Sequence, residues 1–507
     1  MAAARSRLFL ATASAAALAL AACTTVGPDF QTPAPVSTAP GYAMAGEQPP
    51  PGVRLDPDAR MAGPWWQAFG SPALDGVVRL ALADSPSVAE ARAKLERYQA
   101  AQQEATGERG PQAEANANAQ RQKFNPAAFG FQSAADAPGP VGFSRARTFD
   151  LFSLGGRVSY DLDLFGGGRR RVEAAAARAE QAVHEADATY LALSANVALE
   201  AMRIAGLRGE LAALEAIVAD DRTLLDLAHK AFAIGGIPRS TVVQIEAQLA
   251  EDEAILPPLR RRHDAARHQL ALLVGRPPAD WTAPDFDLAQ FTVPAVTPVS
   301  LPSNLVRRRP DILAAEAELH AATAAIGVAL ADQYPNIRLS ANGALSALDP
   351  ADLISPDAAG WTLLSGVTAP VFDGGARKAR TRQAEAEARG AHARYRLTVL
   401  RAFVEVSDAM AALRTDQQRL DALKRAVALS GESADVTLVA ARLGARTASE
   451  VLQSRRQLDR NRRDLAEAQA ERLADLVTLY AASAADWRAT AAPASIRGGP
   501  DGAGAGR

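Results

Sequence analysis

The stretch VALEAMRIAGLRGELAALEAIVADDRTLLDLAHKAF, residues 197–232, decides the fold of this chain. Apolar residues recur in it every seven positions, at Val197, Ile204, Leu211, Val218, Leu225 and Phe232, with Leu207 and Leu214 three positions after two of them. This pattern is typical of long helices that pack side by side in a coiled coil. Because no proline occurs from Arg169 to Phe232, it predicts one helix roughly 95 Å long at about 1.5 Å per residue.

The long helix is predicted to turn back at Gly235-Gly236-Ile237-Pro238, which makes 169–274 a helical hairpin. The rhythm of seven resumes after the turn at Val242, Leu249 and Leu256. Pro257-Pro258 is expected to interrupt the return helix, because proline lacks the backbone N–H that a helix uses. A further helix, with Leu259, Ala266 and Leu273 in register, is expected to run on to Gly275.

A second helical hairpin is predicted over residues 376–483. Its first helix, 376–442, is free of proline and has Leu413, Leu420 and Val427 in register. The chain turns at Leu443-Gly444-Ala445-Arg446, and the rhythm returns at Val451, Leu458 and Leu465. Helices this long exceed the diameter of an ordinary globular domain, so the pattern favours a rod or tube over a buried helical core.

Four shorter segments alternate apolar with polar residues, at about 113–122, 148–165, 337–346 and, more weakly, 361–371. Such alternation is typical of strands with one apolar and one polar face, and a tilted strand needs about 9–11 residues to cross a bilayer. Four strands cannot close a membrane barrel, and open sheet edges are not tolerated in lipid. The strands therefore predict assembly from several copies, with about eight strands in a dimer and about twelve in a trimer.

The N-terminus has the features of a secretory signal peptide, residues 1–22, followed by the single cysteine of the chain, Cys23. Arg5 and Arg7 precede a short apolar stretch, and Leu20-Ala21-Ala22-Cys23 resembles the lipobox of bacterial lipoprotein precursors. We expect cleavage before Cys23, a diacylglycerol on its thiol and a further acyl chain, such as palmitate, on its amine. Residues 23–70 would then be a lipidated tether. The other interpretation is an ordinary secretory peptide in which the cysteine is coincidental.

Composition argues against several other classes of protein. The 55 Lys+Arg nearly balance the 57 Asp+Glu, which disfavours nucleic-acid binding, and one cysteine excludes an internal disulfide framework. The six histidines lack metal-ligand spacing, and no phosphate loop or nucleophile elbow occurs. We therefore expect no catalytic residue, no metal and no cofactor beyond covalent lipid on Cys23. No stretch after the signal peptide approaches ~20 consecutive apolar residues, so we expect no transmembrane helix.

The chain also contains an internal duplication, with one structural repeat expected at 71–300, a second at 301–487 and a flexible tail at 488–507. Pro86 opens a predicted helix in the first repeat, and a matching proline opens the helix 310–331 in the second. Each repeat is predicted to contain a helix, two strands, a long helix, a turn and another long helix. A duplicated unit of this kind suits a tube built from several copies around an axis.

These features resemble the outer-membrane factor family, the TolC-like exit ducts of tripartite efflux and secretion systems, and more narrowly its NodT-type lipoprotein branch. The matching stretches are Cys23-Thr24-Thr25-Val26-Gly27-Pro28-Asp29-Phe30, Trp65-Trp66-Gln67-Ala68-Phe69, Arg308-Arg309-Pro310-Asp311-Ile312 with Ala315-Glu316-Ala317, Pro370-Val371-Phe372-Asp373-Gly374-Gly375, and Arg442-Leu443-Gly444. They cover nearly the whole chain, from Cys23 to about Trp487. Arg-Arg-Pro-Asp followed by Ala-Glu-Ala is the most specific of them.

The resemblance implies a homotrimer with a twelve-stranded β-barrel in the outer membrane of a Gram-negative bacterium, continuous with a periplasmic barrel of coiled-coil helices. It implies a passive exit duct for small molecules, delivered by an inner-membrane pump of the resistance-nodulation-division type through a periplasmic adaptor. It assigns adaptor docking to the tips of the two hairpins, at Gly235, Gly236, Arg442, Leu443 and Gly444.

The resemblance also implies a possible periplasmic gate just past the second tip. Relatives often carry Leu-Asp-Ala there, whereas this chain has Leu452-Gln453-Ser454, with Gln244 at the equivalent place in the first repeat. A ring of neutral side chains would lack the carboxylate, so other residues would supply the gate's polar contacts. The candidates are Asp435, Arg446, Arg455 and Arg456, although each one alone is better interpreted as part of a solvated helix face.

A function of a different class stays open on the sequence alone. A periplasmic coiled-coil adaptor, or a structural lipoprotein without a pore, would share the lipid anchor and the long helices. The four alternating segments and their repetition favour a channel over both.

Overall fold

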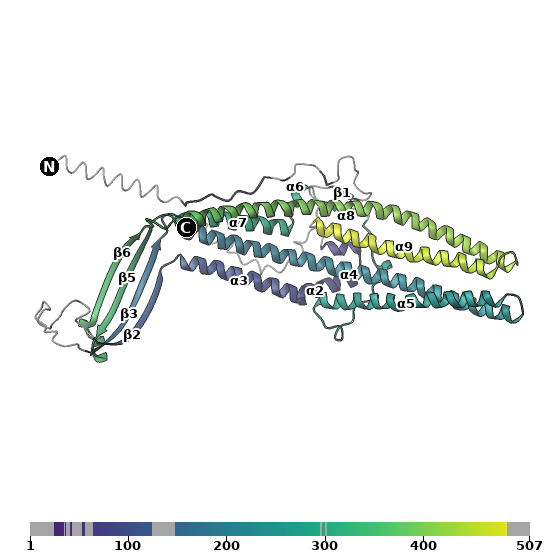
Figure 1. Ribbon diagram of the computed structural model, residues 1–507, viewed down its shortest axis with the longest axis horizontal. Coiled ribbons are helices and arrows are strands. Elements are labelled where there is room, and N and C mark those ends of the chain that lie inside the picture. The colour runs from purple at the N-terminus through teal and green to yellow at the C-terminus, as the bar shows by residue number, and fades with distance from the viewer. Residues whose placement is uncertain are drawn as a thin grey trace, which may run out of the picture. The chain divides into compact units, whose positions relative to one another are not determined.

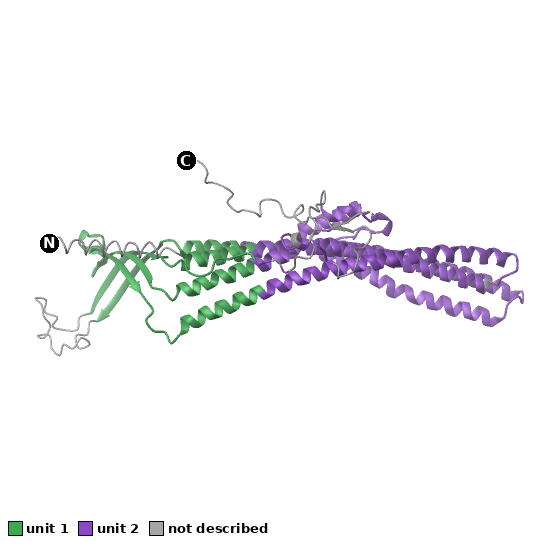
Figure 2. Ribbon diagram, turned by 90° about the horizontal axis from the view of Figure 1, so that it is seen from above, with its two compact units in different colours: residues 1–32, 97–180, 317–392 green, residues 33–96, 181–316, 393–507 purple. Residues whose placement is uncertain are grey.

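The computed structural model describes residues 25–34, 36, 41–42, 53–55, 64–123, 148–294, 297–299 and 302–483. The chain forms two compact units (Figure 2). Unit 1 comprises Met1–Thr32, Arg97–Glu180 and Ala317–His392, and unit 2 comprises Pro33–Glu96, Gln181–Glu316 and Ala393–Arg507. The predicted signal peptide, Cys23, most of the tether and the tail at 488–507 lie outside the described residues.

Unit 1 contains a four-stranded antiparallel sheet in the order β2-β3-β5-β6 (Figure 1). The strands span Gln112–Lys123 (β2), Thr148–Leu162 (β3), Asn336–Ala347 (β5) and Ala359–Thr368 (β6). They form at the four alternating segments. The bounds of β2 and β5 differ from the predicted ones by one residue at each end. By contrast, β3 stops short of residue 165, and β6 is shifted toward the N-terminus.

The early end of β3 has a local cause. The carboxylate of Asp163 accepts hydrogen bonds from the backbone N–H groups of Gly168, at 2.9 Å, and Arg169, at 2.8 Å. These bonds satisfy donors in the first turn of the following helix, which therefore begins at once. β6 ends before Pro370, which has no N–H to offer to a ladder.

The register gives the sheet two different faces. Residues paired directly across antiparallel strands share a face, and one such row is Ala113, Val158, Ala341 and Leu363. The same face carries mostly apolar side chains, including Ala115, Ala117, Phe152, Leu154, Tyr160, Ile337, Leu339, Leu345, Trp361 and Val367. The opposite face carries mostly polar side chains, including Glu114, Asn116, Asn118, Arg157, Asp161, Arg338, Ser340, Asn342 and Thr362, together with the apolar Phe149, Leu151 and Leu364. We call these the apolar face and the polar face.

Long paired helices make up most of the rest of the described chain (Figure 1). The hairpins are α4 (Gly167–Ala233) with α5 (Arg239–Val274), and α8 (Ala376–Arg442) with α9 (Ala448–Ala482). Shorter helices are α2 (Pro72–Asp84), α3 (Pro86–Glu108), α6 (Pro302–Leu305) and α7 (Pro310–Ala331). The remaining elements are β1 (Val53–Leu55), which pairs in parallel with β4 (Thr297–Val299), and the 3-10 turns η1 (Trp65–Phe69), η3 (Leu288–Gln290), η4 (Pro350–Ile354) and η5 (Pro356–Ala358).

The pattern of seven predicts which side of α4 is buried. Val197, Ile204 and Val218 are at most 3% exposed, whereas Phe232, in the last turn, is 40% exposed. The apolar stripe therefore packs against other helices along α4 and is uncovered near its end. Burial of each such side chain contributes about 1.5–3 kcal/mol.

The predicted break at Pro257-Pro258 is wrong, because α5 runs without interruption from Arg239 to Val274. The two prolines remove two backbone donors, but their fixed φ is compatible with a helix. Leu256 and Leu259 on either side of the pair are 9% and 5% exposed. Burial of these two leucines offsets the missing hydrogen bonds and keeps the helix continuous.

The aromatic motif at 65–69 forms part of the core of unit 2. Trp65, Trp66 and Phe69 are at most 1% exposed, and Tyr480 of α9 packs against Trp65 and Phe69 with ring centroids 6.0 and 5.8 Å away. The indole N–H of Trp66 donates to Asp75 at 2.9 Å, so its polar atom is satisfied. This motif holds the fold together.

The Arg-Arg-Pro-Asp motif has a similar role at the start of α7. The guanidinium of Arg309 pairs with Asp311 at 2.7 Å, donates to the carbonyl of Ala482 at 3.0 Å and pairs with Glu405 of α8 at 2.7 Å. One buried arginine therefore fastens the first turn of α7 to α8 and to the end of α9.

α7 is long and apolar enough by composition to cross a membrane, although the sequence predicted no such helix. Its residues Glu316, Glu318 and His320 are polar, and His320 Nε2 lies 3.1 Å from the carboxylate of Glu173 in α4. Because these groups would be unfavourable in lipid, we interpret α7 as a helix that packs on protein.

Candidate functional site

The polar face of the sheet carries charges that pair across the strands. Arg338 donates to both carboxylate oxygens of Asp161, at 2.7 and 2.9 Å, and Arg157 donates to the side-chain oxygen of Asn342 at 2.8 Å. These residues form a hydrophilic surface directly opposite the apolar face. The sheet thus separates two environments.

The apolar face is uncovered in a single copy of the chain. Trp361, Leu363 and Val367 of β6 are 79%, 71% and 66% exposed. β2 and β6 lie at the sheet edges, and no further strand among the described residues pairs with either. An exposed apolar surface with open edges requires lipid on one side and further strands at the edges.

The two hairpin tips have the same backbone geometry. Gly235 and Gly444 have φ of +73° and +74°, as expected for a glycine that ends a helix. The N–H of Gly236 reaches back to the carbonyl of Ala231 at 2.8 Å, and the second tip has the matching bond from Ala445 to Ala440 at 2.9 Å. Both turns are therefore closed by their own backbone and need no partner to form.

The predicted docking residues at these tips lie at the surface. Gly235, Gly236, Arg442, Leu443 and Gly444 are all exposed. The apolar side chains of Leu443 and of the neighbouring Ile234 are 80% and 86% exposed. Nothing in the described part of the chain covers them.

The predicted gate residues make no polar contact with one another in the described part of the chain. Gln244, Gln453 and Asp435 are exposed, and none makes a hydrogen bond or ion pair within the residues that the structure describes. Near them, Leu452 packs on a buried apolar cluster of α4 and α5 that includes Leu224 and Val242. The start of α9 is therefore in contact with the first hairpin close to the tips.

A buried ionic cluster joins three helices at this level. Arg456 of α9 pairs with Asp221 of α4 at 3.0 Å and with Asp252 of α5 at 2.5 Å. The side chains of Arg456 and Asp221 are 14% and 2% exposed. We call these three residues the Arg456 cluster. The interpretation of Arg456 as part of a solvated face is wrong.

The charges of the Arg456 cluster are incompletely satisfied. Asp221 Oδ1 and Arg456 Nε are buried without a hydrogen-bond partner. Burial raises the pKa of Asp221 to about 6, although the hydrogen bond from Arg456 acts in the opposite direction. Buried charges that lack partners destabilise a packed interface, so this contact is held less firmly than an apolar one.

The other basic candidates behave as solvated residues. Arg455 pairs with Asp220 at 3.0 Å, and both side chains are about two-fifths exposed at 39% and 42%. Arg446 pairs at 2.5 Å with Glu450, whose carboxylate also accepts from the backbone N–H of Thr447 at 2.7 Å and so caps α9. Exposed pairs of this kind contribute little to stability.

Asp221 and Asp252 were not among the predicted site residues, although their positions in the sequence carry a signal. Asp221 follows Val218 by three residues, and Asp252 follows Leu249 by three. Both aspartates therefore occupy core positions of the heptad pattern that apolar residues normally fill. A charge at such a position indicates either a break in packing or a buried ionic contact, and here it is the contact.

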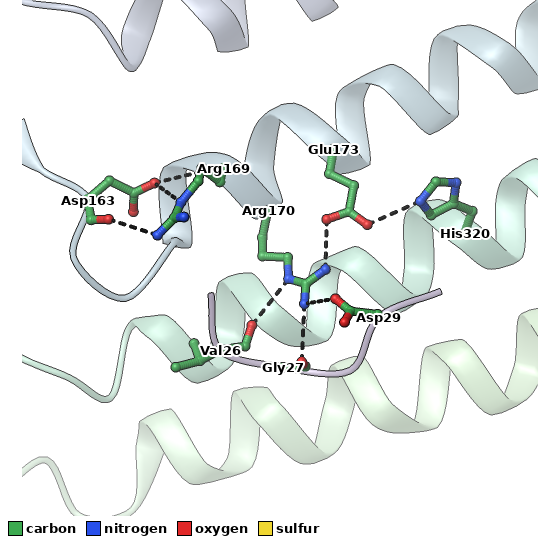
Figure 3. Close-up of polar contacts among 8 residues, drawn as sticks. All are labelled: Val26, Gly27, Asp29, Asp163, Arg169, Arg170, Glu173 and His320. Carbon is green, nitrogen blue, oxygen red and sulfur yellow. Dashed lines mark hydrogen bonds and ion pairs between the residues drawn. The ribbon is translucent and has the colours of Figure 1, made fainter. Parts of the chain in front are cut away.

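The N-terminal segment docks into unit 1 through one buried arginine (Figure 3). The side chain of Arg170 is 4% exposed and donates to the carbonyls of Val26 and Gly27 at 3.2 and 3.1 Å. It also pairs with Asp29 at 2.7 Å and with Glu173 at 2.8 Å. We call the residues from Val26 to Phe30 the strap.

Two further contacts fix the strap. Gly27 has φ of +96°, and a Cβ built there would lie 2.5 Å from the Cα of Gly327 in α7, so only glycine fits. The ring of Phe30 stacks on His320 with centroids 4.5 Å apart. The strap is therefore an integral part of unit 1.

Among the described residues, no group of three or more His, Cys, Asp or Glu could hold a metal ion. The sheet has an apolar and a polar face, is open at both edges and is joined to long paired helices. These features define an outer-membrane channel protein of the TolC-like fold.

Comparison with known proteins identifies the family. The family model described as "Outer membrane efflux protein" matches residues 77–276 and 301–485. The chain belongs to this family, whose members work as trimeric outer-membrane channels in efflux systems. It is an outer-membrane efflux channel of Gram-negative type that extends into the periplasm.

Two relatives illustrate the likeness in sequence. Pyoverdine export outer membrane protein OpmQ of Pseudomonas putida is 28% identical over 474 residues, which cover 93% of this chain and 96% of that protein. Nodulation protein T of Rhizobium leguminosarum bv. trifolii is 26% identical over 413 residues, which cover 80% of this chain and 84% of that protein.

Solved structures show the same fold. The outer-membrane channel OprN matches with a TM-score of 0.81 at 26% identity, covering 92% of this chain and all (100%) of that one. VceC from Vibrio cholerae matches with a TM-score of 0.74 at 25% identity, covering 83% and 98%. These likenesses support a channel, and they give no support to an adaptor or a structural lipoprotein without a pore.

Proposed function

We propose that the chain is the lipid-anchored exit duct of a tripartite efflux system. Small molecules would enter from an inner-membrane pump of the resistance-nodulation-division type through a periplasmic adaptor and leave passively, without catalysis by this chain. The observation that carries the proposal is the two-faced sheet. Three copies that pair β2 of one with β6 of the next would enclose the polar face as an aqueous passage and leave the apolar face to lipid.

The hairpin tips are the surfaces that we assign to the adaptor. Ile234 and Leu443 lie exposed beside turns that their own backbone bonds already close. Burying each of these side chains against a partner would contribute about 1.5–3 kcal/mol. The positive charge of Arg442 next to them adds a polar contact at the rim of such an interface.

We assign the Arg456 cluster as the contact that holds the periplasmic gate closed, and we call it the latch. It ties α9 to the hairpin of α4 and α5, so its release would let the two hairpins of unit 2 separate near their tips. Gln244 and Gln453 would form a neutral ring at the same level, with Asp435 as an exposed acidic neighbour. Partly satisfied buried charges suit a contact that must open.

The strap supports an anchor at Cys23. Val26 follows Cys23 by only three residues, and its N–H donates to the carbonyl of Phe165 at 3.1 Å, just after β3 ends. Acyl chains on Cys23 would therefore start close to the membrane end of unit 1. Cys23→Ala should abolish labelling by radioactive palmitate, and labelling that persists would contradict the assignment of the anchor.

Recordings from the purified protein in planar lipid bilayers test the proposed function. We expect unitary openings that are small or rare for the wild type and larger or more frequent for Arg456→Gln, which leaves Asp221 and Asp252 facing each other without a cation. Arg460→Gln changes an exposed arginine one turn further along α9 and should match the wild type. Absence of any unitary conductance in the wild type and in Arg456→Gln would contradict a channel.

A further inference from the structure

A cavity of about 630 Å³ lies in unit 1, lined by residues at the ends of β3, β5 and β6 and of the adjoining helices. Its lining includes five arginines, namely Arg109, Arg171, Arg338, Arg377 and Arg380. The acidic side chains in its lining are Glu108, Asp161, Asp163 and Asp332. These residues belong neither to the gate nor to the hairpin tips.

Part of this charge is already neutralised within unit 1. Arg338 is held by both oxygens of Asp161, at 2.7 and 2.9 Å, and Arg377 lies 3.4 Å from Asp373. The carboxylate of Asp163 accepts backbone hydrogen bonds at the start of α4, at 2.8 and 2.9 Å. These groups are therefore not free to bind a solute.

Three guanidinium groups remain available. Arg109, Arg171 and Arg380 are exposed and make no ion pair within the described residues, although Arg171 acts on Asp161 at longer range. Glu108 and Asp332 are the unpaired carboxylates of the same cavity. The free groups thus comprise three cations and two anions, and the cations have the bidentate geometry that suits carboxylates.

The cavity opens on the polar side of the sheet. Asp161, Asn336, Arg338 and Thr368 all belong to the polar face and all line it. In the proposed trimer this face surrounds the passage, so three copies of the cavity would lie around the path of a solute. A solute in transit, rather than a membrane lipid, is the ligand that can reach it.

The cavity also offers an aromatic surface. Phe165 and Tyr334 line it and stack on each other, with ring centroids 4.6 Å apart and planes inclined by 19°. Tyr334 is 45% exposed, so one face or edge of the pair is accessible. Guanidinium groups beside an exposed ring suit an organic anion better than a bare inorganic one.

We propose that this cavity is a transient binding site for small organic anions, aromatic carboxylates above all, on their way through the channel. The proposal rests on the proposed function and adds a class of cargo to it. Binding is weak, because the three arginines are exposed, and weak binding is what conduction requires. The neutral Gln244 and Gln453 of the proposed gate add no fixed negative charge of their own to the path of an anion.

The test uses the purified full chain in planar bilayers at low salt, where screening is small. In a KCl gradient, the reversal potential gives the permeability ratio of Cl⁻ to K⁺. In a second measurement, added benzoate should reduce the wild-type current in a concentration-dependent way. Arg171→Gln with Arg380→Gln should lower the permeability ratio by about twofold or more and raise the half-blocking benzoate concentration by a similar factor. The lysine pair, Arg171→Lys with Arg380→Lys, keeps the charge and should retain the permeability ratio but lose part of the benzoate block.

Arg382→Gln is the matched control, because Arg382 is an exposed residue of α8 that does not line the cavity. It should behave like the wild type in both measurements. Channels that conduct but show no benzoate block in the wild type, or the same block and permeability ratio in the double glutamine variant, would overturn the anion site and leave the channel intact. Absence of conductance in both the wild type and Arg456→Gln would instead contradict the proposed function.

Discussion

The two ends of α4 each carry a buried ionic contact with an arginine, but the two contacts differ in how completely they are satisfied. In the first turn, Arg170 donates to two backbone carbonyls and to the carboxylates of Asp29 and Glu173. Near the last turns, Asp221 meets Arg456, and one buried polar atom of each residue lacks a partner. The first contact is complete, and the second is not.

This difference indicates different tasks. A buried charge with all its hydrogen bonds made fixes one arrangement, whereas a partly satisfied charge leaves an alternative arrangement within reach. The contact of Arg170 joins segments that are 141–144 residues apart in the sequence. It fits a permanent attachment of the strap. The Arg456 cluster fits a contact that opens and closes.

The largest effect is expected from Arg170→Ala. It removes the four hydrogen bonds of a buried guanidinium, two of them to backbone carbonyls, and should destabilise the docked strap by on the order of 3–5 kcal/mol. Hydrogen exchange at residues 26–30 should accelerate accordingly. Arg178→Ala, at an exposed position on the same helix, should leave exchange unchanged, and unchanged exchange in Arg170→Ala as well would show that the strap is held by other contacts.

A smaller effect is expected from Arg456→Gln, because the wild-type cluster is already incompletely satisfied. Loss of the cation should weaken the contact of α9 with α4 and α5 by about 2–3 kcal/mol. Hydrogen exchange should rise near Asp221 and Asp252 and stay constant in the sheet. Equal exchange in Arg456→Gln and in the exposed control Arg460→Gln would contradict a latch at this place.

Acid is expected to favour the closed latch. The pKa of Asp221 is raised by burial to about 6 from an ordinary value of 3.8, and opening would return it toward that ordinary value. The closed state therefore binds the proton more tightly, so its relative stability increases as the pH falls from about 7 to about 5. Open probability in planar bilayers should fall over the same range and should not change much above pH 7.

A second buried carboxylate must be separated from this effect. Burial and the neighbouring Asp416 raise the pKa of Asp475 in α9 to about 7. Asp221→Asn should remove most of the pH dependence of the open probability, whereas Asp475→Asn should preserve it. Full pH dependence in Asp221→Asn would assign the titration to a group other than Asp221.

The smallest effect on stability is expected at the tips, where contacts within the chain are few. Ile234→Ser with Leu443→Ser should change the free energy of unfolding by no more than about 0.5 kcal/mol. The same double substitution should strongly reduce cross-linking to the periplasmic adaptor, because these side chains form the proposed docking surface. Normal cross-linking in the double variant would place the adaptor contact elsewhere.

The helices and strands could be predicted because their signals are local. The limits of α8 at Ala376 and Arg442 follow from a proline-free heptad pattern that ends at a glycine turn. The strands follow from the alternation of apolar and polar residues, and their register then decides which face each side chain occupies. The division of the chain into two structural repeats stays a prediction.

The contacts that carry the proposals could be predicted less well, because they are not local. Arg170 and the strap lie far apart in the sequence, and no spacing rule connects them. Asp221 and Asp252 stood at heptad core positions, but only the packing of three helices reveals that one arginine serves both. The continuity of α5 through Pro257-Pro258 likewise depends on burial of its neighbours.

The central claim is that β2 of one copy closes on β6 of the next, and a disulfide measurement tests it directly. In a Cys23→Ala background, which contains no other cysteine, Asn116→Cys on β2 is combined in turn with Gly360→Cys, Thr362→Cys or Leu364→Cys on the same face of β6. Within one chain β3 and β5 separate these positions by roughly 14 Å, which is too far for a disulfide. We predict covalent dimers and trimers, and nothing larger, on a denaturing gel after oxidation of at least one pair. Monomers alone for all three pairs would contradict the closed barrel.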